Sequence, residues 1–134
     1  MIHELELEQI LVDEGFMAKP YKDTRGTWTF GHGLTYLTKN ESKLVVGSQR
    51  LPHIEEHLQE AVPNYCVFPT EVKKVLLNMA YQMGVTGLLG FRLALQAAQE
   101  GDYMEMAWQM KDSEWFEQTP DRARRLIARI EALV

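Results

Sequence analysis

Apolar side chains recur every three or four residues over most of the chain, a spacing that predicts helices. The first predicted helix covers residues 3–14, carries Leu5 and Ile10 on its apolar stripe, and ends at Gly15. The strongest pattern covers residues 70–83. Its inward face is expected to comprise Val72, Val75, Leu76 and Met79. The remaining predicted helices span residues 39–45, 52–62, 91–100 and 102–111, and a last one that begins at Pro120.

Cap and turn residues mark where these helices begin and end. Thr38 and Glu41 have the spacing of a capping box. Pro63 and Gly84 each follow a helical pattern and are expected to end it, because proline removes an amide donor and glycine favours a helix C-terminus. Thr119 is expected to cap the final helix with its side chain.

Residues 20–37 break the helical pattern and favour β-structure. Strand-forming side chains gather there, among them that of Thr29. Asp23 and Gly26 hold the first and last places of a type I turn. A short hairpin is therefore predicted between the first helix and the helix over residues 39–45.

The chain is expected to form one domain, residues 1–134, of the α+β class and mainly helical, because its length suits a single compact core. A small α/β lobe would comprise residues 15–65. A helical lobe would comprise residues 1–14 together with residues 66–134. The groove between two such parts is the expected binding site.

Composition excludes several classes of function. A net charge of −5 is unfavourable for general nucleic-acid binding. No apolar run approaches the roughly 18 residues that a membrane span needs, and no secretory leader is visible. The lone Cys66 indicates a reducing compartment and is expected to be a small buried residue. Core positions are also expected for Trp108, Trp115, Met104, Met106 and Met110.

One basic cluster interrupts this acidic composition near the C-terminus. Its members are Arg122, Arg124, Arg125 and Arg129. The cluster is compatible with a solvated face that complements a helix end and, equally, with a functional role for one of its members.

Two carboxylates near the N-terminus carry the clearest chemical signal. Glu14 occupies the last turn of its helix, where the helix dipole disfavours a negative charge and partial burial would add to that effect. Both effects favour the protonated form, as a general acid requires. Asp23, at a turn, would stay ionised, and the hydroxyl of Thr29 could hold a water. Taken singly, each residue is also compatible with an ordinary surface, turn or strand position.

Three segments of the chain resemble the phage-type lysozymes, a family of muramidases. They are the span from Glu14 to Thr29 followed by Phe30-Gly31-His32-Gly33, the segment Asn78-Met79-Ala80-Tyr81-Gln82-Met83-Gly84, and the segment Trp115-Phe116-Glu117-Gln118-Thr119-Pro120-Asp121-Arg122-Ala123. The resemblance covers residues 4–37 and 68–130, which is most of the chain.

The resemblance implies a glycoside hydrolase that cleaves the β-1,4 bond between N-acetylmuramic acid and N-acetylglucosamine in peptidoglycan, with inversion. Glu14 would protonate the glycosidic oxygen, and Asp23 would stabilise the cationic sugar or act with Thr29 on the attacking water. The two carboxyl groups would lie about 6.5–9.5 Å apart to leave room for that water. Substrate-binding roles would fall to Gly33, Tyr81, Gln82 and Arg122. Arg122 would also pair with Glu14, and no metal or cofactor is implied.

Two positions depart from the family pattern. His32 lies inside the Gly-x-Gly motif, although many members place a histidine after it, and this affects the packing of the predicted hairpin. Glu114 stands before Trp115 in place of a basic residue and would weaken the positive side of the groove. Residues 43–67 receive no family assignment.

Two alternatives remain open. The fold could serve as a catalytically weak or inert wall-binding or virion structural module, since function resides in the site and not in the scaffold. More remotely, His53-Ile54-Glu55-Glu56-His57 matches a zinc-peptidase pattern and places both histidines on one helix face. The apolar side of that helix would comprise Leu51, Ile54, Leu58 and Ala61, which leaves the histidines towards water.

The expected partner is the glycan strand of peptidoglycan, bound by a monomer, without nucleic acid or stable membrane insertion. Because no signal peptide is visible, the protein would be made in the cytoplasm of a bacterial host. It would reach the wall through a pore made by another protein, or it would be carried by a virion.

Overall fold

The computed structural model describes residues 2–14 and 38–134, and all regular secondary structure in that part of the chain is helical. The α-helices are α1 (Ile2–Glu14), α2 (Lys39–Val45), α3 (Leu51–Ala61), α4 (Thr70–Leu89), α5 (Arg92–Gln99), α6 (Tyr103–Lys111), α7 (Glu114–Gln118) and α8 (Pro120–Glu131). A π-helical turn, η1 (Val46–Arg50), and a 3-10 turn, η2 (Tyr65–Val67), complete the set. The mainly helical class is thereby confirmed. The hairpin predicted over residues 20–37 lies outside the described residues and stays a prediction.

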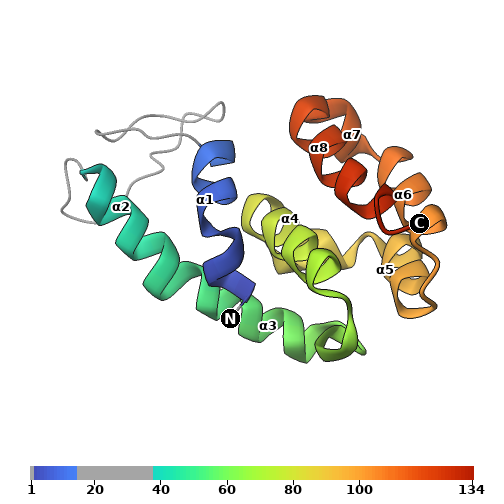
Figure 1. Ribbon diagram of the computed structural model, residues 1–134, viewed down its shortest axis with the longest axis horizontal. Helices are drawn as coiled ribbons and strands as arrows, with labels where there is room; N and C mark the ends of the chain where they lie inside the picture. Colours follow the sequence, from blue (N-terminus) through green and yellow to red (C-terminus); the bar gives the residue numbers. More distant parts are fainter. Residues whose placement is uncertain (1, 15–37) are drawn as a thin grey trace.

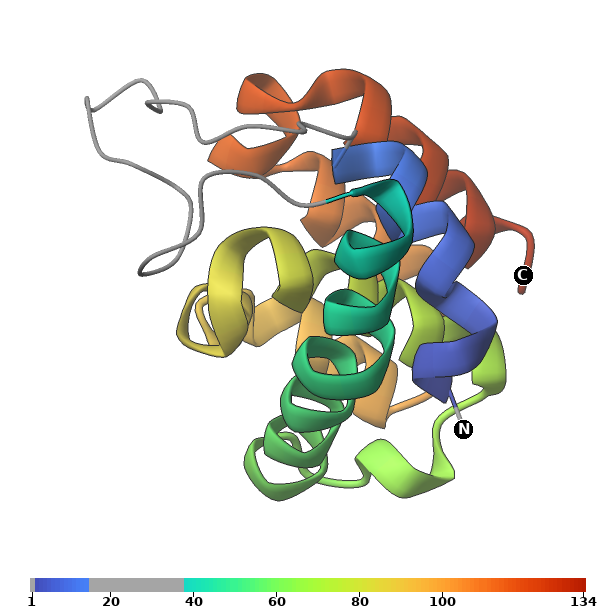
Figure 2. The same ribbon diagram turned by 90° about the vertical axis from the view of Figure 1, so that its left-hand side faces the viewer.

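The helices form two groups that share α4. On one side, α2, η1 and α3 form one continuous rod, and α1 lies against it (Figure 1). On the other side, α5 to α8 gather beyond α4. The most extensive helix–helix contacts are those of α5 with α6, α6 with α8, α1 with α4 and α3 with α4. The first helix therefore packs on the C-terminal half of the chain, far from it in sequence, and in Figure 2 it lies in front of α8.

The buried core follows the helical spacing seen in the sequence. The inward face predicted for α4 is confirmed, because all four of its apolar members are at most 1% exposed. Those residues are Val72, Val75, Leu76 and Met79. Ile10 of α1, Leu58 of α3 and Ile127 of α8 meet the same core. Burial of apolar surface by long-range helix pairs thus holds the described part of the chain together.

The rod of α2, η1 and α3 was predicted as two separate helices. The capping box is present, since Thr38 Oγ1 accepts from the amide of Glu41 at 3.1 Å and the Glu41 carboxylate accepts from the amide of Thr38 at 2.8 Å. The helix then continues past the predicted end, because the π turn η1 leads directly into α3. Pro52, which has no amide donor, lies in the first turn of α3 directly after η1. Pro63 follows the end of α3, as expected.

Gly84 interrupts α4 where the sequence predicts the helix to end. Its φ of 82° and ψ of 159° lie in a region that side-chain-bearing residues rarely adopt. Residues after Gly84 resume helical geometry as far as Leu89, so the predicted short connection is itself a helical turn. The kink changes the direction of α4 at the end of segment 78–84, which resembles the phage-type lysozymes.

Several side chains expected in the core lie on the surface instead. Trp108 is 61% exposed and Met104 is 65% exposed, because they lie four residues apart on the outer side of α6. Met106 and Met110 occupy the inner side of the same helix and are fully buried. Trp115 is buried, as predicted.

Three further burial predictions are wrong for related reasons. Cys66 is exposed, because η2 turns Tyr65 towards the core and directs the next residue outward. Leu5 is 61% exposed, and the buried face of α1 instead includes His3 and Glu6. Ala61 is exposed at the last position of α3. Helical spacing alone does not show which face of a helix meets a neighbour, or that polar side chains such as His3 and Glu6 are buried there.

Tyr65 supplies a test of burial energetics. It is 2% exposed, and its hydroxyl has no hydrogen-bond partner in the part of the chain that the structure describes. Burial raises the pKa of the phenol, and the nearby Glu55 raises it further. A raised folded-state pKa contributes stability that is present below the unfolded value of about 10 and is lost as the pH rises towards the folded value.

Replacing Tyr65 with Phe is expected to raise the free energy of unfolding by about 1 kcal/mol at pH 7, because it removes an unpartnered buried hydroxyl. The variant should also lose less stability above a pH of about 10. Urea unfolding at neutral and alkaline pH measures both effects, with Tyr103→Phe at a partly buried tyrosine as the control. A clear loss of stability on substitution would mean that the hydroxyl has a partner.

Candidate active site

Glu14 is the last residue of α1, and a buried arginine from α8 holds its carboxylate. Arg122 donates from Nη1 to Glu14 Oε1 at 2.7 Å, so the predicted pairing is present. The Arg122 side chain is 9% exposed, whereas that of Glu14 is 36% exposed. The carboxylate is thus anchored from the protein interior and open to solvent on its other side.

Asn78 of α4 orients this arginine. Its Oδ1 accepts from Arg122 Nε at 3.0 Å and from Arg122 Nη2 at 2.8 Å. Its Nδ2 donates to Asp13 Oδ2 at 3.0 Å and to Glu6 Oε2 at 2.9 Å. Asn78 is fully buried, and these contacts fix which way its amide points. The amide is therefore a junction between α1, α4 and α8.

Asp13 and Glu14 are adjacent carboxylates with different surroundings. The Asp13 side chain is 0% exposed and receives hydrogen bonds from Asn78, Arg125 and Gln9. All of these hydrogen bonds hold the Asp13 carboxylate inside the protein, and a change in its charge would weaken them together. Within residues 2–14 and 38–134, Glu14 has one hydrogen-bond partner, Arg122, and its side chain is partly exposed, so it is the better candidate for chemistry on a bound molecule.

A second ion-pair cluster extends the network along α1 and α8. Arg129 donates to both carboxylate oxygens of Glu6, at 2.9 Å each, and to Glu71 at 3.0 Å. The hydrogen bonds that Arg129 donates to Glu6 are the main reason that the pKa of Arg129 is raised. Burial alone would raise the pKa of Glu71, but hydrogen bonds from Arg129 and Lys74 lower it. We call the set Glu6, Asp13, Glu14, Asn78, Arg122, Arg125 and Arg129 the interhelical network.

The basic cluster seen in the sequence divides between this network and the surface. Arg122, Arg125 and Arg129 each pair with a carboxylate of α1. Arg124 instead lies 3.6 Å from Asp121 on the same helix, with 65% of its side chain exposed. Most of the cluster is thus structural, and Arg122 alone contacts the candidate acid.

Tyr81 lies close enough to Glu14 to feel its charge. The phenol is half-buried, and burial is the main cause that raises its pKa, followed by the charge of Glu14. Arg50 of η1 and Arg122 act in the opposite direction. A neutral phenol beside the candidate acid is a hydrogen-bond donor suited to a polar ligand such as a sugar. Arg50 is a neighbour that the sequence did not indicate.

Gln82, also predicted to bind substrate, is occupied by contacts within the protein. Its Oε1 accepts from Trp115 Nε1 at 2.9 Å, and its Nε2 donates to Thr119 Oγ1 at 3.3 Å. The Thr119 hydroxyl donates in turn to the carbonyl of Trp115 at 3.1 Å and makes no side-chain cap on α8, which corrects the predicted cap. Gln82 therefore ties α4 to α7.

Replacing Gln82 with Ala is expected to lower the free energy of unfolding by about 1–3 kcal/mol, since it leaves the buried Trp115 indole without its partner. Chemical denaturation measures this change. Gln96→Ala removes an exposed hydrogen bond to Glu100 and should stay within about 0.5 kcal/mol. Unchanged stability combined with a raised KM on peptidoglycan would instead favour a direct contact between Gln82 and the saccharide.

Three of the predicted site residues, Asp23, Thr29 and Gly33, lie outside the described residues, as does His32. Their positions relative to Glu14 stay predictions. The described residues bring together Glu14, Tyr81 and Arg122, and they connect Gln82 to α7.

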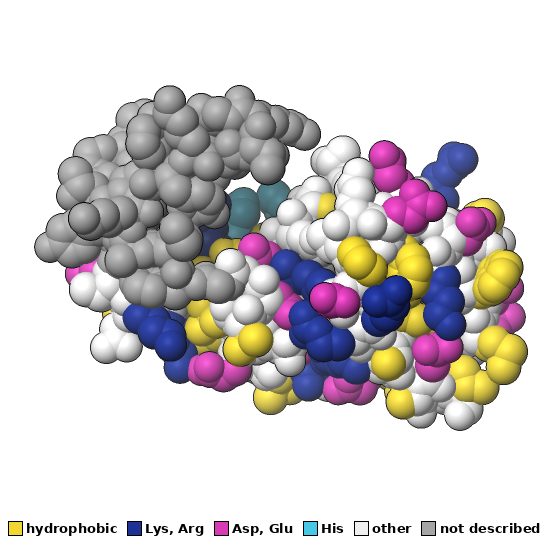
Figure 3. All heavy atoms as spheres, turned by 90° about the horizontal axis from the view of Figure 1, so that it is seen from above, with side chains coloured by type: hydrophobic (Ala, Val, Ile, Leu, Met, Phe, Trp, Pro, Cys, Tyr) yellow, Lys and Arg dark blue, Asp and Glu magenta, His cyan; other side chains and the backbone are white. Residues whose placement is uncertain are grey.

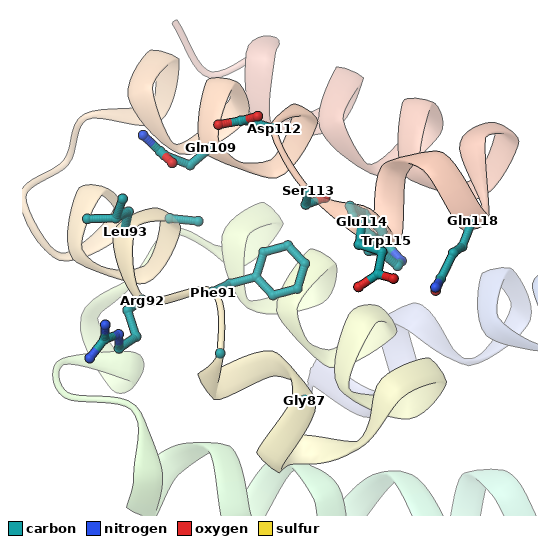
Figure 4. Close-up of a pocket in the computed structure, with 12 residues that line it drawn as sticks. Gly87, Phe91, Arg92, Leu93, Gln109, Asp112, Ser113, Glu114, Trp115 and Gln118 are labelled. Atoms are coloured by element: carbon teal, nitrogen blue, oxygen red, sulfur yellow. The ribbon is translucent and has the colours of Figure 1, made fainter.

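A pocket of about 700 Å³ lies between α5, α6 and α7, next to the end of α4 (Figure 4). Phe91 and Trp115 form its aromatic wall, with ring centroids 5.8 Å apart in an edge-to-face arrangement. Arg92, Gln109 and Glu114 also line it. Trp115 joins this pocket to Gln82 through one hydrogen bond, and Glu114 places a negative charge on its wall.

Acidic and basic side chains are interspersed over the face of the molecule drawn in Figure 3. On that face, the described residues present no continuous field of one sign. Attraction to a charged polymer would therefore depend on local contacts, as the net charge of −5 also indicates.

Three residues of the network, Glu6, Asp13 and Asn78, were missed by sequence reasoning, and the sequence carried a signal for Asn78 and for Asp13. Asn78 is a polar residue inside the apolar pattern of α4, one position after the fully buried Leu77. Asp13 directly precedes Glu14 at the unfavourable end of a helix. A buried polar residue requires a hydrogen-bond partner. The sequence therefore indicated that Asn78 and Asp13 have such partners, but it did not identify them.

The zinc-peptidase alternative requires a third ligand beside His53 and His57. Both histidines and Glu56 are exposed on α3, while Glu55 turns inward, where its carboxylate accepts a hydrogen bond from His3 Nδ1 at 2.8 Å. Residues 2–14 and 38–134 contain no group of three or more histidine, cysteine or acidic side chains placed to hold a metal ion. That part of the chain does not complete a catalytic zinc site.

Similarity to known proteins extends over most of the chain. A family model described as "Phage lysozyme" matches residues 12–132, a range that includes Glu14, Asp23 and Thr29. "Probable T4-type lysozyme 1" of Dictyostelium discoideum is 28% identical over 156 residues, covering 92% of this chain and 92% of that protein. "Probable T4-type lysozyme 2" of the same organism is 27% identical over 157 residues, with the same coverage of both chains.

Proposed function

Because the chain belongs to the phage lysozyme family, we propose that it is a peptidoglycan-degrading muramidase in which Glu14 is the general acid. The proposed reaction hydrolyses the β-1,4 bond between N-acetylmuramic acid and N-acetylglucosamine. The observation that carries the proposal is the contrast between Asp13 and Glu14, since only Glu14 combines a fixed position with an open side.

Glu14 would give its proton to the glycosidic oxygen as the bond to the leaving sugar breaks. Arg122, 2.7 Å away, would then stabilise the carboxylate that proton transfer leaves behind. Asn78 would hold the guanidinium in place, so that Arg122 need not reorganise during the reaction. Tyr81 would donate a hydrogen bond to the saccharide beside this acid.

The second half of the reaction is assigned to residues outside the described part of the chain. Asp23 would stabilise the oxocarbenium-like sugar or would act with Thr29 to direct a water at the anomeric carbon. Attack from the face opposite the leaving group would invert that carbon. Gly33 would let the sugar approach the backbone closely.

Mass analysis of fragments released from purified peptidoglycan tests the proposed bond. Fragments that end in reducing muramic acid are expected. Anhydro-muramic acid ends would indicate a lytic transglycosylase, and free peptides would indicate an amidase or a peptidase. Wall that binds the protein but releases no fragment would support an inert wall-binding module.

The route to the wall is a separate part of the proposal. Among the helices of residues 2–14 and 38–134, none has both the length and the apolar character that a bilayer crossing requires. A phage or prophage product acting as a monomer on the wall, released through a pore made by another protein or carried by a virion, fits the family.

A further inference from the structure

Helix α3 presents two histidines side by side on its solvent face. His53 and His57 are both exposed and lie four residues apart, which places them one above the other on a helix. Their ring centroids are 4.3 Å apart, with the ring planes inclined at 53°. Neither ring belongs to the interhelical network, and neither has a role in the proposed hydrolysis.

We propose that His53 and His57 form a bidentate site for a first-row divalent transition metal such as Zn²⁺, Ni²⁺ or Cu²⁺. Imidazole nitrogen is a preferred ligand of these ions. A Zn–N bond is about 2.0–2.1 Å long, so two nitrogens in a tetrahedral site lie about 3.3 Å apart. Rings whose centroids are 4.3 Å apart reach that separation by side-chain rotation, without a change in the helix.

The protein supplies two ligands to this site and leaves the remaining positions to water. Glu55 cannot be a third ligand, because it is buried and bonded to His3. No cluster of three metal-binding side chains exists among the described residues, so the site differs from a closed structural zinc site. We therefore expect an exchangeable metal and an affinity below that of a three- or four-ligand site.

The helix itself provides the chelate. Once one imidazole has bound, the helix holds the second close to the metal, and this high effective concentration strengthens binding over that of a single histidine. Binding and folding are linked, because the two rings share a face only when residues 53–57 are helical. A metal that occupies the site should therefore stabilise the folded protein.

Calorimetric titration with ZnCl₂, and separately with NiCl₂, tests the site. The reference protein carries Cys66→Ser, because the exposed thiol would also bind these metals. The matched control adds His57→Ala together with Gln59→His, which preserves the number of histidines. Gln59 is exposed and lies six residues after His53, on a different face of α3. The control should bind each metal at least tenfold more weakly than the reference.

A second measurement does not depend on heat of binding. Saturating ZnCl₂ should raise the thermal midpoint of the reference protein, and it should leave that of the control unchanged. The imidazole NMR signals of the two histidines should shift together during titration. Equal affinity in reference and control, or shifts confined to another histidine, would overturn the proposed site.

Discussion

Replacing Glu14 with Gln is expected to reduce the rate of peptidoglycan hydrolysis by about 10²–10⁴-fold, the contribution typical of a general acid. Glutamine has nearly the same shape and keeps an oxygen that can accept from Arg122, so the variant should remain folded. What it lacks is a proton that can be transferred to the leaving oxygen. Turbidity loss of purified wall, normalised to folded protein measured by circular dichroism, gives the ratio of rates.

The matched control for this variant is Glu8→Gln. Glu8 lies on the same helix, is exposed, and pairs with Lys43 on the surface. Its substitution should change neither the hydrolysis rate nor, beyond about 0.5 kcal/mol, the stability. Equal clearing by the native protein and by Glu14→Gln would reject the assignment of the acid, and activity in neither would favour an inert module.

The second large effect is expected on stability, from Arg129→Met. Glu6 is 1% exposed, and the substitution removes both of its hydrogen bonds to the guanidinium. A buried carboxylate that loses its cation is strongly unfavourable, typically by about 3–5 kcal/mol. We expect about 3 kcal/mol, because roughly a quarter of the Arg129 side chain is exposed and water screens that part of the pair. Urea unfolding at pH 7 measures the difference.

A double variant shows whether the loss of stability in Arg129→Met comes from the unpaired charge of the buried Glu6. Glu6→Gln combined with Arg129→Met removes both charges and should recover part of the stability that Arg129→Met loses. Arg124→Met is the matched surface control and should cost less than about 0.5 kcal/mol, since its partner Asp121 is almost fully exposed. Equal losses for Arg124→Met and Arg129→Met would mean that burial does not govern these ion pairs.

The two substitutions, Glu14→Gln and Arg129→Met, change residues at opposite ends of the interhelical network. Glu14, which is partly exposed, lies at one end of the interhelical network, and Arg129 lies at the other end against the buried Glu6, with Asn78 between them. A network that is fully bonded inside and open at one carboxylate is a rigid support for a single reactive group. The energetic loss at Arg129 and the kinetic loss at Glu14 are therefore expected to be separable.

Much of the helical pattern could be predicted because it depends on local chemistry. The capping box at Thr38 and Glu41, the inward face of α4 and the interruption at Gly84 follow from side-chain spacing and backbone preference. The continuous rod through η1 could not, because a proline at position 52 predicts the start of a separate helix. The exposure of Trp108 and Cys66 likewise depends on which face of an element meets a neighbour.

The sequence by itself determined the candidate acid, its helix and its resemblance to lysozymes, because these depend on residue type and on spacing within short segments. The tertiary structure decided which of two adjacent carboxylates is open, and that Asn78 and three arginines from α8 surround the carboxylates of α1. These contacts join residues more than 40 positions apart. Buried hydrogen bonds between helices depend on how the helices pack against one another, and the sequence pattern within one helix does not specify that packing.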